Sequence, residues 1–497
     1  MKKAKKILAL FLSALCAVSS ASCGTGTVGE QPSNSVDTTT ATTTAPATTT
    51  EAATTLPEEP VEAVNFSAGY ARVDISPDKF PVPNDNGNAT SLMNPLYATV
   101  VAVSDGENEA LFISLDTIFV MDEVLTQTLL KAKKYGVPEK YVFINSTHNH
   151  SSVRYNQKTN EVAAWKTKYG NSIDKAIKEA LNDLTPTTAE IGRTETDKLA
   201  FVRRYYMNDG KVKGIHMPTN SSGVARHETE ADPELQVIRF NREGKKDIVM
   251  ANWQAHAAHA VGLFPDTINA DFVHYFRKDV EEKYDVLFAY YQGAAGNINL
   301  NSDIYGNKNF VGVGQKLAVA LGTALENAEP ATLGMIQAQK IGLTANIDHS
   351  TDNLLSKANT AWKEYNDYLN KTGTKMTPDM IYAKYGFNSR YHITCIIRRS
   401  NLPKTVDLPI SAISFGDISF ASAPYEMFDT NGMYIKDNSR FKTTFVCAYT
   451  NGHFGYIPSA LGYQNGGYEA YISRFEAGTG ELVAEKLVEM LNKQYEN

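Results

Sequence analysis

Several features are scarce or absent in this sequence, and each absence argues against a class of structure or function. The 497 residues include only four cysteines and three tryptophans. No cluster of basic residues is interleaved with aromatic ones and the net charge is −7, a balance that argues against binding to nucleic acid. After the amino-terminal leader no hydrophobic run approaches the length of a membrane span, and no internal repeat is present.

The first 22 residues have the pattern of a signal peptide. Four lysines within the first six residues precede an apolar run over residues 7–18, which is too short to span a bilayer, and small residues follow. Cys23 stands where a lipidated cysteine would begin the mature chain. We therefore expect an exported lipoprotein whose only membrane contact is this anchor, with an ordinary cleaved and secreted protein as the alternative.

Residues 23–61 are rich in threonine, alanine, serine, proline and glutamate, and contain no aromatic residue. Such a composition cannot bury a core and predicts a disordered tether. Residues 62–497 are long enough for one large or two closely packed domains, and we treat them as one folded domain. Its two cysteines, Cys395 and Cys447, lie in apolar, strand-like surroundings, so either a disulfide or two buried thiols are expected.

Within this domain strand-like and helix-like segments alternate without a regular period. Two β runs flank a hairpin signal at Asp105-Gly106, and a second hairpin is expected around Gly416-Asp417. Helical periodicity is expected over residues 122–134, 162–184, 272–284, 311–328, 354–384 and 479–495. The pattern predicts an α/β fold of mixed β-sheets flanked by helices.

Histidines follow two of the predicted strands. His148 and His150 come after one strand, and their spacing would place both rings on the same side of an extended chain. His256 and His259 come after another. Two such clusters are compatible with a catalytic zinc site. The first can also be a structural or exposed pair, and His259 can be a residue that supports a ligand, contacts the substrate or faces solvent.

An ordered series of segments resembles the neutral/alkaline non-lysosomal ceramidases and their bacterial relatives. The matching segments are AGYARVDISP (68–77), NSTHNHSS (145–152), NWQAHAAH (252–259), NADFVHYF (269–276), YYQGAAGNIN (290–299), SAPYEMF (422–428), NGHFGYIPS (451–459) and GGYEA (466–470). The resemblance implies a ceramidase-like catalytic domain without the family's carboxyl-terminal immunoglobulin-like domain.

The resemblance also implies a site. It assigns the ligands of a Zn²⁺ ion to His148, His256, Glu426 and Tyr456. Zinc-activated water would cleave an amide or ester bond in an extracellular small-molecule, lipid-like or glycan substrate. His150 or His259 would then serve as general acid or base.

Two positions depart from the family pattern. We place the family's catalytic serine at Asn269, whose amide can orient a substrate but cannot act as a nucleophile. Asn297 replaces an aspartate that the family usually has. The first departure supports a rival hypothesis, that of a lipoprotein that binds a ligand without catalysis. Weaker candidates for the same cleft are Asp116, Arg203 and Arg204. The sequence does not indicate the oligomeric state.

Overall fold

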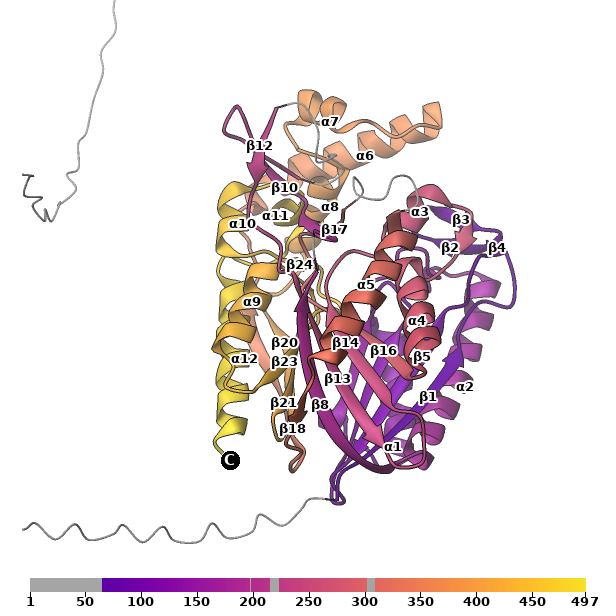
Figure 1. Cartoon of the computed structure of the whole chain (residues 1–497). Coiled ribbons are helices and arrows are strands. Elements are labelled where there is room, and N and C mark those ends of the chain that lie inside the picture. The colour runs from indigo at the N-terminus through magenta and orange to yellow at the C-terminus, as the bar shows by residue number, and fades with distance from the viewer. Residues whose placement is uncertain (1–64, 197, 215–222, 302–308) are drawn as a thin grey trace, which may run out of the picture. The chain divides into compact units, whose positions relative to one another are not determined.

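Two β-sheets stacked face to face form the centre of the molecule (Figure 1). The computed structural model describes residues 65–196, 198–214, 223–301 and 309–497. The expected signal peptide and tether lie outside these residues and stay predictions. Within the described part of the chain, no helix combines the length and the apolar character needed to cross a membrane.

The larger sheet is mixed. Its strands lie in the order β16 (Leu287–Gln292), β14 (Ile248–Trp253), β13 (Glu234–Arg242), β8 (Thr185–Glu195), β1 (Ser67–Asp74), β5 (Tyr97–Ser104), β6 (Glu109–Leu115) and β7 (Val142–Ser146), and β18 (Glu329–Ala331) also pairs with β8. The pairs β14–β16 and β6–β7 are parallel, whereas the other pairs are antiparallel.

The smaller sheet packs on one face of the larger one. Its order is β19 (Gln337–Asn346), β20 (Thr405–Phe415), β21 (Ile418–Ser422) and β23 (Thr443–Cys447). Phe112 of β6 and Phe420 of β21 meet with ring centroids 4.1 Å apart, and both are fully buried. The core therefore lies between the sheets, as expected for alternating apolar strands that each need a partner surface.

Helices cover the outer faces (Figure 1). The larger sheet is covered by α1 (Asp122–Lys134) and α2 (Asn160–Asn182) on one half, and by α4 (Asp271–Tyr284) and α5 (Asn309–Glu326) on the other. The smaller sheet is covered by α9 (Asp429–Asn438) and α12 (Thr479–Tyr495). The predicted fold class, mixed sheets flanked by helices, is confirmed.

Shorter elements complete the fold. A helical excursion comprises α6 (Leu355–Thr372), α7 (Pro378–Tyr385) and α8 (Arg390–Arg399), which bury a small core of their own. The remaining helices are α3 (His259–Leu263), α10 (Ala460–Asn465) and α11 (Tyr468–Ile472). Small sheets pair β2 (Val82–Asn84) with β3 (Gly87–Ala89), β4 (Ser91–Leu92) with β15 (Thr267–Ile268), β9 (Ala200–Val202) with β17 (Ile298–Leu300), β10 (Arg204–Met207) with β11 (Val212–Gly214) and β12 (Val224–His227), and β22 (Glu426–Met427) with β24 (Tyr456–Ile457).

Most expected elements are present. Both predicted hairpins form, and the helices expected at 122–134 and 479–495 have those bounds. Two details differ. Cys395 lies on α8 rather than on a strand, and it and Cys447 are buried free thiols, so the second of the two alternatives holds. The helix expected over residues 354–384 is divided into two helices, α6 and α7, which are separated by residues 373–377.

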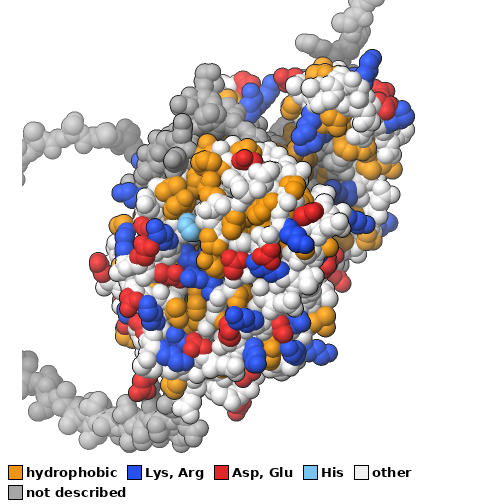
Figure 2. Space-filling view, turned by 90° about the vertical axis from the view of Figure 1, so that its right-hand side faces the viewer, with side chains coloured by type: hydrophobic (Ala, Val, Ile, Leu, Met, Phe, Trp, Pro, Cys, Tyr) orange, Lys and Arg blue, Asp and Glu red, His pale blue; other side chains and the backbone are white. Residues whose placement is uncertain are grey.

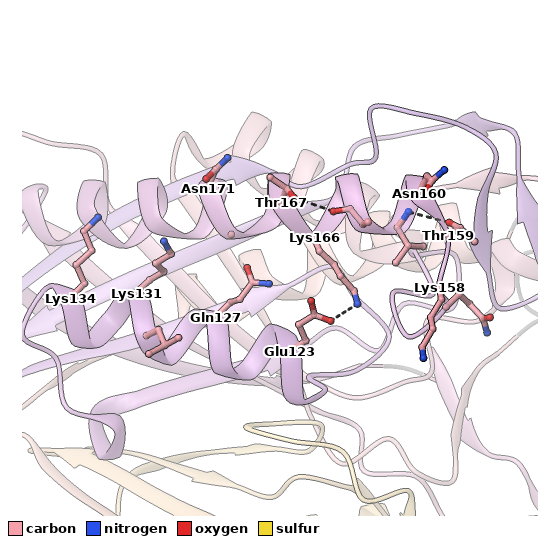
Figure 3. A pocket seen from close by; sticks show the side chains of 15 residues that line it. Glu123, Gln127, Lys131, Lys134, Lys158, Thr159, Asn160, Lys166, Thr167 and Asn171 are labelled. Carbon is pink, nitrogen blue, oxygen red and sulfur yellow. Dashed lines mark hydrogen bonds and ion pairs between the residues drawn. The ribbon is translucent and has the colours of Figure 1, made fainter.

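The surface of the side bearing α2 carries both signs of charge interspersed, with hydrophobic side chains gathered towards its upper part (Figure 2). A groove of about 870 Å³ runs between α1 and α2 and is lined by lysines and by amide and hydroxyl side chains (Figure 3). Two of these lysines are neutralised, Lys134 by Asp174 and Lys166 by Glu123. This groove shares no residue with the histidine cluster described next.

Candidate metal centre

Curling of the larger sheet brings the two histidine loops together. The end strands β7 and β16 meet, as a hydrogen bond between them shows: the backbone N–H of Gln292 donates to Asn145 Oδ1 at 2.8 Å. The loops that follow β7 and β14 then join directly, with the N–H of His150 donating to the carbonyl of Ala257 at 2.9 Å. Residues more than one hundred positions apart in the chain therefore share one site.

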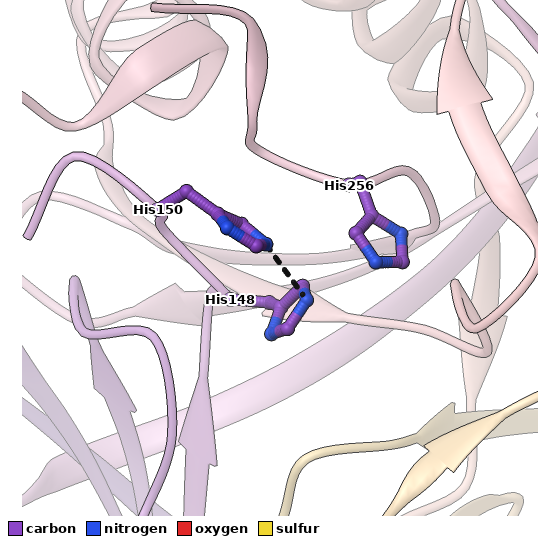
Figure 4. Close-up of side chains that lie close together, drawn as sticks. All are labelled: His148, His150 and His256. Carbon is purple, nitrogen blue, oxygen red and sulfur yellow. Dashed lines mark hydrogen bonds between the residues drawn. The ribbon is translucent and has the colours of Figure 1, made fainter. Parts of the chain in front are cut away.

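Three histidines form the centre of this site (Figure 4). Ligand nitrogens of His148, His150 and His256 all lie within 4.8 Å of one another. His148 Nε2 is 3.2 Å from His150 Nε2. The backbone of His148 is in the left-handed region, with φ 57°, so an extended chain is not the reason that the two rings converge.

Each ring is held from behind by its other nitrogen. His148 Nδ1 lies 2.9 Å from the carbonyl of Ile118, and His256 Nδ1 lies 3.1 Å from the carbonyl of Ile298. Because a carbonyl only accepts hydrogen bonds, both Nδ1 atoms carry the proton and both Nε2 atoms present a lone pair to the centre. Burial holds the pKa of both histidines well below the usual value. The neighbouring His256 and His150 lower the pKa of His148 further, and Arg203 and His150 lower that of His256, so both rings are neutral at pH 7.

His150 is held by a carboxylate that the sequence reasoning did not single out. Its Nδ1 lies 2.6 Å from Asp85 Oδ2, and Asp85 Oδ1 also accepts from Arg154 at 2.9 Å. Although burial opposes it, the hydrogen bond with His150 keeps the pKa of Asp85 below its usual value. A carboxylate behind a histidine is the usual support of a metal-binding imidazole. Nothing in the polar Asn- and Gly-rich segment around Asp85 would have predicted this contact.

Glu426 and Tyr456 reach the centre side by side because β22 and β24 pair in parallel with these two residues in register. Glu426 Oε2 lies 3.4 Å from the Nε2 atoms of both His148 and His256. The phenol oxygen of Tyr456 lies 3.3 Å from His256 Nε2. The four ligands that the resemblance implies are thus brought together, together with His150.

The donor set fits a cation. Glu426 is 4% exposed, and its Oε2 is buried without any hydrogen-bond partner in the described structure. Burial raises the pKa of Glu426 to about 8. An acceptor carboxylate that faces imidazole lone pairs is destabilising unless a proton or a metal ion lies between them. Nitrogen and carboxylate ligands of this kind suit zinc.

Buried arginines support the tyrosine. Arg203 Nη2 donates to the phenol oxygen of Tyr456 at 3.0 Å, and its Nε donates to Glu469 at 3.0 Å. Arg204 donates to the other oxygen of Glu469 at 2.8 Å and also pairs with Glu228. The two arginines thus meet protein carboxylates. Glu469 was missed, although it lies in the GGYEA segment.

The other predicted residues lie around the cluster. Asn269 is fully buried; its Nδ2 donates to Thr267 at 3.1 Å and its Oδ1 accepts from the N–H of Asp271 at 3.0 Å, so its amide is engaged within its own loop. His259 begins α3, where burial lowers its pKa and Asp271 opposes the shift. Among the described residues, neither side chain forms a hydrogen bond or a ring contact with the three histidines.

Two further candidates, Asp116 and Asn297, have structural contacts. Asp116 pairs with Arg277 at 2.9 Å. Asn297 donates to Asp429 at 2.6 Å, and burial raises the pKa of Asp429 to about 7. Asn299 was not singled out from the sequence. Its backbone forms an isolated parallel β-bridge with His256, and its side-chain Oδ1 accepts a hydrogen bond from Arg203 at 3.3 Å.

Comparison with known proteins gives structural neighbours but no sequence relatives. The chain superposes on the neutral ceramidase from Pseudomonas aeruginosa with a TM-score of 0.65 and 15% identity, covering 86% of this chain and 74% of that one. It superposes on a ceramidase complexed with C2 with the same TM-score and identity, covering 87% and 76%. No family model and no curated protein sequence matches. The ceramidase-like fold is confirmed, and identity this low shows the fold alone.

Proposed function

We propose that this chain is a zinc-dependent hydrolase that cleaves an amide or ester bond in an extracellular substrate. The observation that carries the proposal is the convergence of the Nε2 atoms of His148 and His256 on the unpartnered Glu426 Oε2, at 3.4 Å each. Bound zinc would polarise the scissile carbonyl and lower the pKa of a water molecule towards 7. The substrate class, a small-molecule, lipid-like or glycan compound, stays open.

The chain's own side chains then have distinct tasks. His148, His256 and Glu426 hold the ion, and Tyr456 supplies an oxygen whose position is fixed by Arg203. His150 is the group best placed to move a proton, since Asp85 holds its Nδ1 and its Nε2 faces the centre, and the same support would suit a ligand. His259 stays a second candidate for the acid or base.

Export belongs to the same proposal. The leader at residues 1–22 would direct secretion, and lipidation of Cys23 would attach the protein to the cell surface through the tether at 23–61. The buried free thiols Cys395 and Cys447 are compatible with an oxidising compartment because neither is accessible for pairing.

A second candidate function is capture of a ligand without catalysis. The observation that favours it is Asn269, at the position where we place the family's catalytic serine, with both ends of its amide engaged within the loop. In this second function the metal site would be kept, but the bound ligand would not be cleaved.

Two measurements test the proposal. Elemental analysis of the purified protein, with an anomalous map at the zinc edge, should show one zinc per chain between the three histidines. H148A should lose the metal and the hydrolysis of a panel of amide and ester substrates, whereas H349A, at a partly exposed histidine paired with Asp352, should keep both. Zinc without turnover of any substrate would favour capture. Absence of zinc from the wild-type protein would overturn both candidates.

A further inference from the structure

Three arginines lower the pKa of His453 in the loop that carries Tyr456, and one of them, Arg154, also pairs with Asp85 at 2.9 Å. Arg154 follows the His148–His150 loop, Arg398 lies in the last turn of α8, and Arg474 follows α11. We call these three residues the arginine cluster. They come from elements far apart in sequence, so their meeting is a property of the fold.

The contacts of Arg474 place the cluster beside the metal centre. Its Nη2 lies 3.8 Å from the point where a Cβ on Gly455 would stand, and the carbonyl of Gly455 accepts from the N–H of Glu426 at 2.9 Å. Cys395 Sγ contacts the carbonyl of Ser473 at 3.3 Å. Arg398 is three residues after Cys395 and so lies on the same side of α8.

The positive charge of Arg398 and Arg474 is not neutralised by the protein. Within the described residues, no carboxylate lies within 4.0 Å of either guanidinium, and neither side chain makes a hydrogen bond. The adjacent Arg399 differs, because it pairs with Asp348 at 2.7 Å. Burial and the nearby Arg398 lower the pKa of Arg474, as expected for two cations held close together.

His453 links the cluster to the metal ligands. Its ring stacks on Phe119 with centroids 3.5 Å apart, and Phe119 lies 5.3 Å from the ring of His148. His453 Nδ1 is buried without a partner. Burial and then the three arginines lower the pKa of His453 to about 3, so the ring is neutral and offers a polar atom for a ligand.

We propose that the arginine cluster, with His453, binds an oxyanionic group beside the metal centre. Guanidinium groups form the strongest charge-assisted hydrogen bonds with phosphate, sulfate and carboxylate oxygens, and such an anion would relieve the repulsion between Arg398 and Arg474. The statement that this anion belongs to the substrate rests on the proposed function. The substrate would then be an amide or ester that carries a negative charge near the scissile bond.

Anion binding is tested on metal-depleted protein, so that zinc cannot contribute. The probes are phenyl phosphate, phenylacetate and uncharged benzyl alcohol, titrated by calorimetry. At least one of the two anions should bind, and R474Q and R398Q should each weaken it about tenfold or more, as for loss of one charged hydrogen bond. The anion that binds more tightly identifies the chemical group, phosphate or carboxylate, that the site prefers. R440Q, at an exposed arginine paired with Glu496, is the matched control and should bind like the wild type.

Binding of neither anion, or equal binding by the wild type and R398Q, would overturn the inference. Arg398 is exposed, so R398Q keeps this test decisive even if R474Q fails to fold. Benzyl alcohol binding as well as the anions would also overturn it, because the site would then recognise the ring.

The zinc-loaded enzyme separates this inference from the proposed function. The substrates are p-nitrophenyl hydrogen glutarate, which is an anion, and its uncharged methyl ester. The anionic ester should have the lower KM, and R398Q should bring the KM values of the two esters together. Anion binding without hydrolysis of either ester would refute the hydrolase and keep the anion site. Hydrolysis with the same KM ratio in R398Q would refute the anion site and keep the hydrolase.

Discussion

Replacing Asp85 by asparagine tests the metal centre at a residue that the sequence did not indicate. Asp85 Oδ2 lies 2.6 Å from His150 Nδ1, so D85N removes the negative charge that orients this ring. Loss of such a supporting carboxylate costs about 10–100-fold in metal affinity, or about 1.4–2.8 kcal/mol. The change leaves the side-chain volume almost unaltered.

The same loss should be visible in thermal unfolding. Free zinc at 100 times the wild-type Kd stabilises the folded state by about 2.7 kcal/mol, and a variant with a 10–100-fold higher Kd would gain about 1.4–0.4 kcal/mol at that concentration. At about 1–2 °C per kcal/mol for a domain of this size, zinc should raise the Tm by about 3–5 °C in the wild type and by about 1–3 °C or less in D85N.

The assay is zinc titration against a competing chelator, with Tm measured on the metal-free and zinc-loaded forms of each protein. Using the difference between the two forms cancels any effect of D85N on the metal-free fold. D78N is the matched control, since Asp78 is an exposed carboxylate that pairs with Lys168. Wild-type zinc affinity in D85N would refute the reasoning that His150, held by Asp85, supports the ion.

Three further predictions concern neighbouring residues. Because burial raises the pKa of Glu426 to about 8 and the carboxylate must lose its proton to bind zinc, zinc affinity should rise up to about tenfold per pH unit between pH 6 and 8 and level off above. Calorimetry in buffers of different ionisation enthalpy should detect the released proton at pH 7, and a flat profile would contradict the assignment. G296A should weaken zinc binding and lower the free energy of unfolding by about 1–3 kcal/mol, because a Cβ there would stand 2.6 Å from the carbonyl of Glu426; G262A, in open space, is the control. E469Q should lower the free energy of unfolding by about 3–5 kcal/mol in denaturant titrations, since this fully buried carboxylate joins two buried arginines. A loss below 1 kcal/mol would show that the network is not stabilising.

Local sequence patterns determined most of the secondary structure. The hairpin at Asp105-Gly106 and the helix at 122–134 follow from turn chemistry and periodicity, which depend on neighbours within a few residues. The run around Cys395 has a strand-like pattern but forms α8, because short apolar runs do not distinguish strand from helix.

The candidate site also combines residues that the sequence indicates with contacts that only the fold creates. Sequence alone brought out His148, His150 and His256, because histidines directly after apolar strands are visible in one dimension, and the family resemblance added Glu426 and Tyr456. Their convergence required the curling of the large sheet that joins β7 to β16, and the parallel pairing of β22 with β24. Asp85 and the arginine cluster had no local signal at all. Long-range neighbours such as these are chosen by chain packing, so only the tertiary structure could decide which charges meet and which remain without a partner.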